Sequence, residues 1–129
     1  MHIKDIEGIG NKYSEKLTAA GIDEVEDLVP LSKSEIKKLA KETGISEKLL
    51  DKWQEHADLI RIKGVGPEYA EALNEIGIDS VKELAQRNPE NTLKKIEDMD
   101  KEKPDVIRKL PTVKQITAWI EEAKKIKDE

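Results

Sequence analysis

The sequence predicts an all-α protein made of two copies of one helical unit. Residues 6–28 and 62–84 match at 11 of 23 positions at a constant offset of 56, and three of the matched pairs are glycines. Apolar residues recur at the three- and four-residue spacing of helices, and no stretch keeps the two-residue alternation of a strand. The chain is therefore expected to be a duplication with pseudo-symmetry between its units.

The first unit starts with a turn over residues 3–6 and a Gly8-Ile9-Gly10 hairpin. A helix is expected over residues 11–20, because its apolar residues fall on one face. Gly21 ends this helix, since glycine accepts the left-handed conformation that follows a helix C-terminus. Asp23 is expected to cap the short helix after it.

Two longer helices complete the first unit. Ser32 and Glu35 have the spacing of a capping box, and Gly44 stops the helix that they begin. Ser46 caps the next helix, which carries Trp53. Trp53, like Trp119 in the last helix of the second unit, is expected to be a buried core anchor.

The second unit repeats this order with insertions. Its expected helix starts are Ser80 with Glu83, Asn88 before Pro89, and Thr112 with Gln115. Past the hairpin region, the expected correspondences are Ile36 with Leu93 and Leu39 with Ile96, after one inserted residue, and Trp53 with Trp119. The units are expected over residues 1–58 and 59–129, joined by a continuous helix over residues 49–62, which lack glycine and proline.

Composition limits the classes of protein that fit. Apolar residues make up 36% of the chain and charged residues 40%, and the net charge is −5. The absence of cysteine excludes disulfides and thiolate metal sites. No apolar run has the length of a membrane span and no signal-peptide core is present, so a cytoplasmic protein without a membrane partner is expected. This charge is not that of a dedicated nucleic-acid binder, although phosphate contacts made by the backbone need few basic side chains.

Enzymatic function is not expected. The sequence contains no Ser-His-Asp set, phosphate-binding P-loop or dinucleotide fingerprint. His2 and His56 lack companions at metal-ligand spacing, so neither a metal site nor a cofactor is expected.

The two Gly-x-Gly hairpins carry the strongest functional signal. Paired glycines let the backbone turn tightly, and the amides that follow lie at a helix N-terminus, where partial positive charge favours an anion. Phosphate is the natural ligand of such a turn. Two interpretations stay open: contact with phosphate by at least one turn, or a purely structural turn between packed helices.

The same pattern, h-x-x-h-x-G-h-G-x-x-x-A/S, resembles the helix-hairpin-helix motif. It occurs at Ile3, Ile6, Gly8, Ile9, Gly10 and Ser14, and at Leu59, Ile62, Gly64, Val65, Gly66 and Ala70. The longer pattern, which continues through A-G-I-D-x-V-E-D-L to T-G-I-S and a tryptophan-bearing helix, is similar to the amino-terminal domain of archaeal and eukaryotic RecA-family recombinases, a SAM-like fold. The tandem form resembles a prokaryotic domain family whose function is uncharacterised.

This resemblance implies a set of phosphate-binding residues, among which the glycines and tyrosines would act through their backbone amides. They are Gly8, Ile9, Gly10, Lys12 and Tyr13 in the first unit, and Lys63, Gly64, Val65, Gly66 and Tyr69 in the second. Lys12 stands where DNA-binding hairpins are often basic, whereas the matching residue is Glu68. Some hairpins of this family bind a monovalent cation through main-chain carbonyls, here those of Ile6, Ile9, Ile62 and Val65. Tyr13 and Tyr69 are expected to pack in the core.

The favoured function is weak, sequence-independent binding of a nucleic-acid backbone, with DNA as the partner. The alternative is a protein-interaction adaptor that uses the same helical surfaces. A positive potential around the hairpins would favour nucleic acid, and an exposed apolar patch elsewhere would favour the adaptor.

Overall fold

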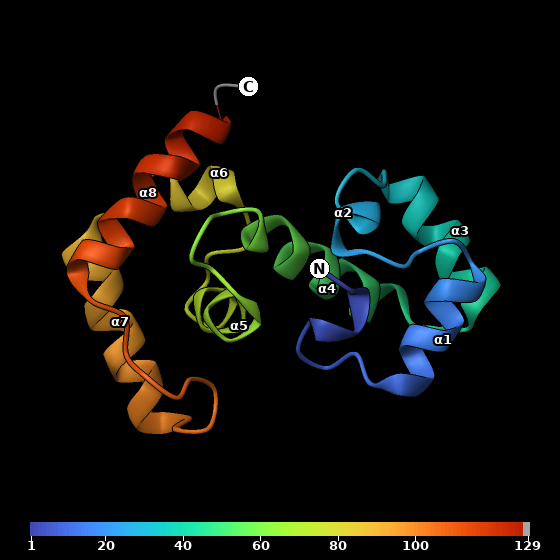
Figure 1. Ribbon diagram of the computed structural model, residues 1–129, viewed down its shortest axis with the longest axis horizontal. Helices are drawn as coiled ribbons and strands as arrows, with labels where there is room; N and C mark the ends of the chain where they lie inside the picture. The colour runs from blue at the N-terminus through green and yellow to red at the C-terminus, as the bar shows by residue number, and fades with distance from the viewer. Residues whose placement is uncertain (128–129) are drawn as a thin grey trace. The chain divides into compact units, whose positions relative to one another are not determined.

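The computed structural model describes residues 1–127 and is all-helical over that range (Figure 1). Residues 128 and 129, the last two of the expected second unit, lie outside the described residues. An isolated antiparallel bridge between His2 and Glu24 is the only extended pairing among the described residues. The elements are η1 (Ile3–Asp5), α1 (Asn11–Ala19), α2 (Val25–Leu28), α3 (Lys33–Thr43), α4 (Glu47–Ile60), α5 (Pro67–Glu75), α6 (Val81–Leu84), α7 (Pro89–Glu102) and α8 (Val113–Lys127).

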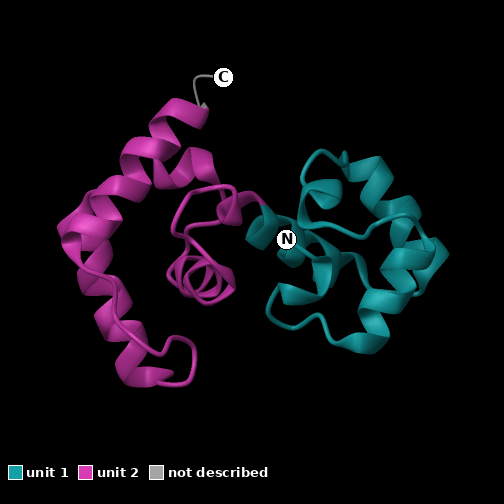
Figure 2. Ribbon diagram, viewed as in Figure 1, with its two compact units in different colours: residues 1–57 teal, residues 58–129 magenta. Residues whose placement is uncertain are grey.

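The chain divides into two compact units, Met1–Ala57 and Asp58–Glu129 (Figure 2). Helix α4 crosses the division, so its last turn belongs to the second unit. The helix expected to join the units over residues 49–62 is present and ends at Ile60.

The repeat is confirmed in the order of helices. Helices α1 and α5 begin and end 56 residues apart, and so do α2 and α6. Helices α1 and α5 also end in the same way, with Gly21 and Gly77 left-handed at φ +93° and +92°. The Ile22 amide donates to the Leu17 carbonyl at 2.8 Å, and the Ile78 amide donates to the Leu73 carbonyl at 2.9 Å. These bonds are those of a Schellman motif, which satisfies the carbonyls that a helix end leaves free.

The longer helices begin at the expected capping residues. Ser32 accepts a hydrogen bond from the Glu35 amide at 3.2 Å, and Asn88 accepts one from the Asn91 amide at 3.0 Å. These two caps are also 56 residues apart, so helices α3 and α7 start without an insertion. The expected one-residue shift is therefore wrong at this point: Thr92, which is 3% exposed, takes the place of Ile36 in the core.

The expected cap of α2 is also wrong. The helix begins after Glu24, and the Asp27 carboxylate accepts the amides of Asp23 and Glu24 at 3.2 and 3.0 Å. Asp23 instead uses its carbonyl to accept the Ile3 amide at 2.8 Å. A carboxylate one turn inside the helix can satisfy the amides that precede the helix, and here Asp27 does so.

Each unit has its own aliphatic core around one tryptophan. The first core includes Ile3, Ile6, Leu17, Leu28, Ile36, Leu50 and Trp53, and the second includes Leu59, Ile62, Leu73, Leu84, Ile96, Ile116 and Trp119. Trp53 is 1% exposed and Trp119 2%, which confirms both as core anchors. In the second unit, α8 packs against α6 and α7.

Candidate nucleic-acid interface

The two Gly-x-Gly turns have the same backbone geometry. The Ile9 amide donates to the Ile6 carbonyl at 3.1 Å, and the Val65 amide donates to the Ile62 carbonyl at 3.0 Å. Ile9 and Val65 thus have buried side chains, 4% and 3% exposed, and amides engaged within the turn. Their contribution to a site is to shape the turn.

The first glycine of each turn is required by the fold. Gly8 and Gly64 have φ of +93° and +90°, where a side chain is strained. A Cβ atom on Gly8 would lie 3.4 Å from Nε1 of Trp53, and one on Gly64 would lie 3.0 Å from Nε1 of Trp119. Each turn therefore rests directly on the tryptophan of its own unit.

A tyrosine from the following helix completes each of these clusters. The rings of Tyr13 and Trp53 lie 5.2 Å apart at 61°, and those of Tyr69 and Trp119 lie 5.0 Å apart at 50°. Both tyrosines are partly buried against the indole, which agrees with a packing role. The clusters hold each turn at the amino end of the helix that follows it.

The second glycine of each turn has no such structural requirement. Gly10 and Gly66 precede α1 and α5 with φ of −86° and −93°, and no atom lies within 4 Å of a Cβ built on either. Neither residue has a side chain that could accept a bond from the first-turn amides. The side of the helix start next to the second glycine is therefore not filled by a side chain of that glycine, as a bound anion would require.

Basic side chains lie next to the first Gly-x-Gly turn, that of Gly8–Gly10. Lys12 is exposed in the first turn of α1, which contains no acidic residue. A shallow hollow of about 420 Å³ adjoins the helix start and is lined in part by Lys4 and Asn11. A negatively charged ligand would meet Lys4 and Lys12 here, with Glu7 in the Gly-x-Gly turn and Glu15 in the lining of the hollow as opposing charges.

The second turn is occupied by acidic groups of its own unit. Oε2 of Glu122, from α8, accepts the Lys63 amide at 2.8 Å. Pro67 begins α5, so the first amide of that helix is missing. The equivalent first-unit positions are Glu7 and Asn11, both of which keep an amide N–H.

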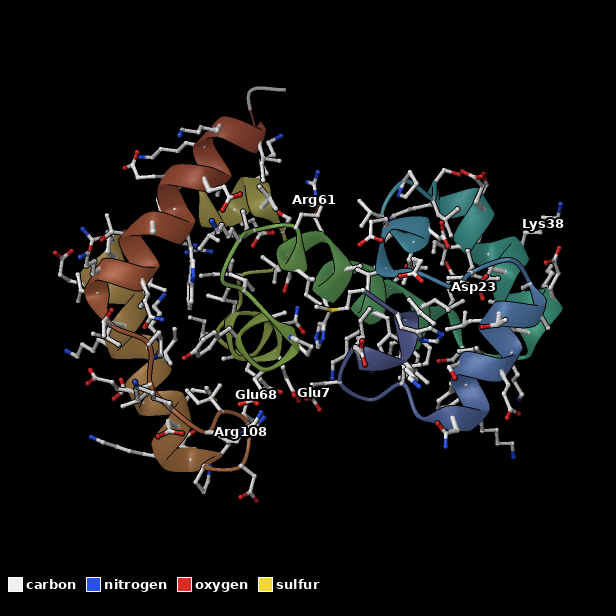
Figure 3. All side chains as sticks on the ribbon, viewed as in Figure 1. Glu7, Asp23, Lys38, Arg61, Glu68 and Arg108 are labelled. Carbon is white, nitrogen blue, oxygen red and sulfur yellow. The ribbon has the colours of Figure 1, made fainter. Side chains whose placement is uncertain are left out.

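Arg108 is a residue of this region that the sequence did not indicate. Its guanidinium meets Oε2 of Glu68 at 2.6 Å, and its amide donates to Oε1 at 3.0 Å (Figure 3). These bonds from Arg108 hold the pKa of Glu68 below its usual value. Tyr69 adds a second tie, since its hydroxyl donates to the Lys109 carbonyl at 3.0 Å.

These contacts bring the α7–α8 loop, residues 103–112, over the start of α5. The corresponding loop of the first unit spans only residues 44–46, so the first turn has no equivalent cover from its own unit. Glu68, the acidic counterpart of Lys12, is thus paired with the cation Arg108. The two Gly-x-Gly turns have the same backbone geometry but differ in how accessible they are to a ligand.

The histidines show no metal-binding arrangement. His56 is fully buried in α4, and Nδ1 of His2 accepts the Lys4 amide at 3.1 Å. Within residues 1–127, no three His, Cys, Asp or Glu side chains converge as a metal site would need.

One protein-family model covers nearly all of the chain. A family model described as "Domain of unknown function (DUF4332)" matches residues 7–126, which include both turns and both tryptophans. The chain belongs to the DUF4332 family. Neither the curated proteins nor the solved structures include a significant match to it. None of the helices of this DUF4332 protein, over the part of the chain described, has the length and apolar character needed to cross a bilayer.

Proposed function

We propose that this protein is a non-catalytic module that binds the nucleic-acid backbone, with DNA favoured, through the Gly8–Tyr13 turn. The turn would act as a helix-hairpin-helix phosphate site, in keeping with the resemblance to recombinase amino-terminal domains. One observation carries the proposal: Gly10, which neither the backbone angle nor the packing requires, precedes a helix start that has an exposed lysine and, unlike the start after Gly66, no acidic residue in its first turn. A bare position at a helix start is useful when a ligand must approach the amides closely.

The second turn is proposed to contribute less. Glu122 accepts the Lys63 amide, Pro67 removes another amide, and the 103–112 loop covers the helix start. A phosphate would have to displace a carboxylate that is already bonded there. The assignment of Lys63, Gly64, Val65, Gly66 and Tyr69 to phosphate binding therefore becomes secondary to that of the first turn.

The adaptor alternative has less support. Among the described residues, the exposed large apolar side chains are Met1 and Leu110, which belong to different units. Single exposed side chains are ordinary on a protein surface and do not form a docking patch.

The proposal predicts weak, salt-dependent binding. A fluorescent oligonucleotide titrated with the protein should give a Kd on the order of 10⁻⁴–10⁻⁶ M, with a log–log salt slope of about −2 to −4. Changes of base sequence should have little effect, because amides at a helix start contact phosphate and not base edges. An absence of binding even at ~50 mM salt would reject nucleic-acid binding and leave the adaptor.

Matched charge reversals locate the site. Lys12→Glu should weaken binding and flatten the salt slope by roughly one. Lys38→Glu, on α3 (Figure 3), makes the same change in net charge and should have a smaller effect, as should Lys63→Glu. Equal losses for all three would show that only net charge matters and that the first turn is not the site.

Gly10→Glu tests the amides themselves. The position has room and an ordinary φ, so the helix should survive, which circular dichroism can verify. The new carboxylate would stand where the phosphate should bind, and a bound oligonucleotide should be lost. Unchanged affinity in a folded Gly10→Glu protein would contradict the proposal.

A further inference from the structure

The second unit contains a hollow that is separate from both turns. It has a volume of about 500 Å³ and lies between the C-terminal end of α5, the α6–α7 loop and the first turns of α7. Its lining includes the apolar residues Ile76 and Ile78, of which Ile78 is buried, and the cations Arg87, Lys94 and Lys95. Hollows of this size are typical of small-molecule sites, which range from roughly 300 to 1,000 Å³.

The first unit provides an internal comparison for this hollow. Because the caps Ser32 and Asn88 lie 56 residues apart, the lining residues can be paired with their first-unit counterparts at that offset. Four apolar residues of the first unit are replaced by polar or cationic ones: Pro30 by Gln86, Leu31 by Arg87, Ile36 by Thr92, and Leu39 by Lys95. Ile36 and Leu39 are buried core residues, at 1% and 6% exposure.

The charge of the hollow has changed in the same direction. The ten lining positions hold three cations against Asp98, a net charge of +2, while their ten first-unit counterparts hold one lysine against two glutamates, a net charge of −1. Arg87 has one acidic neighbour, Glu83, at 3.9 Å. The two units therefore differ at this place: the first unit has the edge of its core there, and the second unit has a cationic hollow.

The remaining side chains suit a ligand that combines an anion with a flat polar body. Gln86 and Asn91 supply side-chain amides that can donate and accept hydrogen bonds, Asn88 can donate while its oxygen caps α7, and the partly buried Ile76 supplies an apolar surface. Cations clustered beside such a surface bind phosphate through charge-assisted hydrogen bonds. We propose that this hollow is a binding site for a small organic phosphate of nucleotide size, independent of the site proposed at the first turn.

The test is a titration of the ¹⁵N-labelled protein with AMP, with adenosine as the matched probe that lacks phosphate. AMP should give saturable amide shifts clustered at residues 76–78 and 86–95, and adenosine should bind at least about tenfold more weakly. Shifts confined to residues 8–13, equal binding of adenosine, or no saturable shifts with AMP would each overturn the proposal.

Two variants separate the hollow from general surface charge. Lys95→Leu installs the residue that the first unit carries and should weaken AMP binding about tenfold, since a charged hydrogen bond is lost. Lys101→Leu removes a lysine from the same helix outside the hollow and should leave the affinity unchanged. Equal losses in the two proteins, with their helices intact by circular dichroism, would show that the hollow does not bind the phosphate.

Discussion

At the scale of single residues, the two glycines of each turn should respond differently to the same substitution. Gly64→Ala places a methyl group at positive φ and 3.0 Å from the Trp119 indole, so it should lower the free energy of unfolding by about 1–2 kcal/mol or more. Gly66→Ala meets neither obstacle, and its effect should stay within about 0.5 kcal/mol. Urea denaturation followed by circular dichroism measures both. Similar losses in the two variants would mean that the indole and the positive φ do not explain Gly64.

At the scale of elements, the 103–112 loop should be tied to α5 in a pH-dependent way. The pKa of Glu68 is lowered by Arg108, so the pairing stabilises the fold above the usual glutamate pKa and this stability is lost as the pH falls through the lowered value. Glu68→Gln should therefore reduce the Tm at pH 7, and the difference from the parent protein should shrink toward pH 3. Glu90→Gln, an exposed first-turn acid of α7, is the matched control and should show little change. A difference for Glu68→Gln that is the same at both pH values would rule out the ion pair as its cause.

The same loop marks the limit of what the sequence predicts. The helices, most of their caps and the left-handed Gly21 follow from signals within a few residues, and the sequence predicts them correctly. The Asp23 prediction is wrong because the helix starts one residue later, with Glu24 as its cap, and the Asp27 carboxylate accepts the amides of Asp23 and Glu24. The contacts of Glu68 with Arg108 and of Lys63 with Glu122 join residues 40 and 59 positions apart. Local periodicity carries no information about such pairs, so the difference in access between the turns could not be predicted.

At the scale of the whole molecule, helix α4 should make unfolding cooperative. It supplies Trp53 to the first core and Leu59 to the second. Unfolding of the first unit would therefore fray a helix that contributes to the core of the second unit. Gly8→Ala is strained at φ +93° and should lower the hydrogen-exchange protection of the Ile22 and Ile78 amides by a similar factor, roughly 5–30. Gly10→Ala should change neither. Unaltered protection at Ile78 in the Gly8→Ala protein would mean that the second unit is stable alone.

Because each indole lies against the glycine turn of its own unit, the fluorescence of each tryptophan can report on that turn. The emission of tryptophan depends on what surrounds its ring, and Nε1 of Trp53 faces the turn that is proposed to hold phosphate. A ligand that docks on Gly8 and Gly10 should alter the fluorescence of Trp53, while Trp119 reports on the covered turn. Single-tryptophan versions of the chain could thus follow each turn separately, without an attached dye.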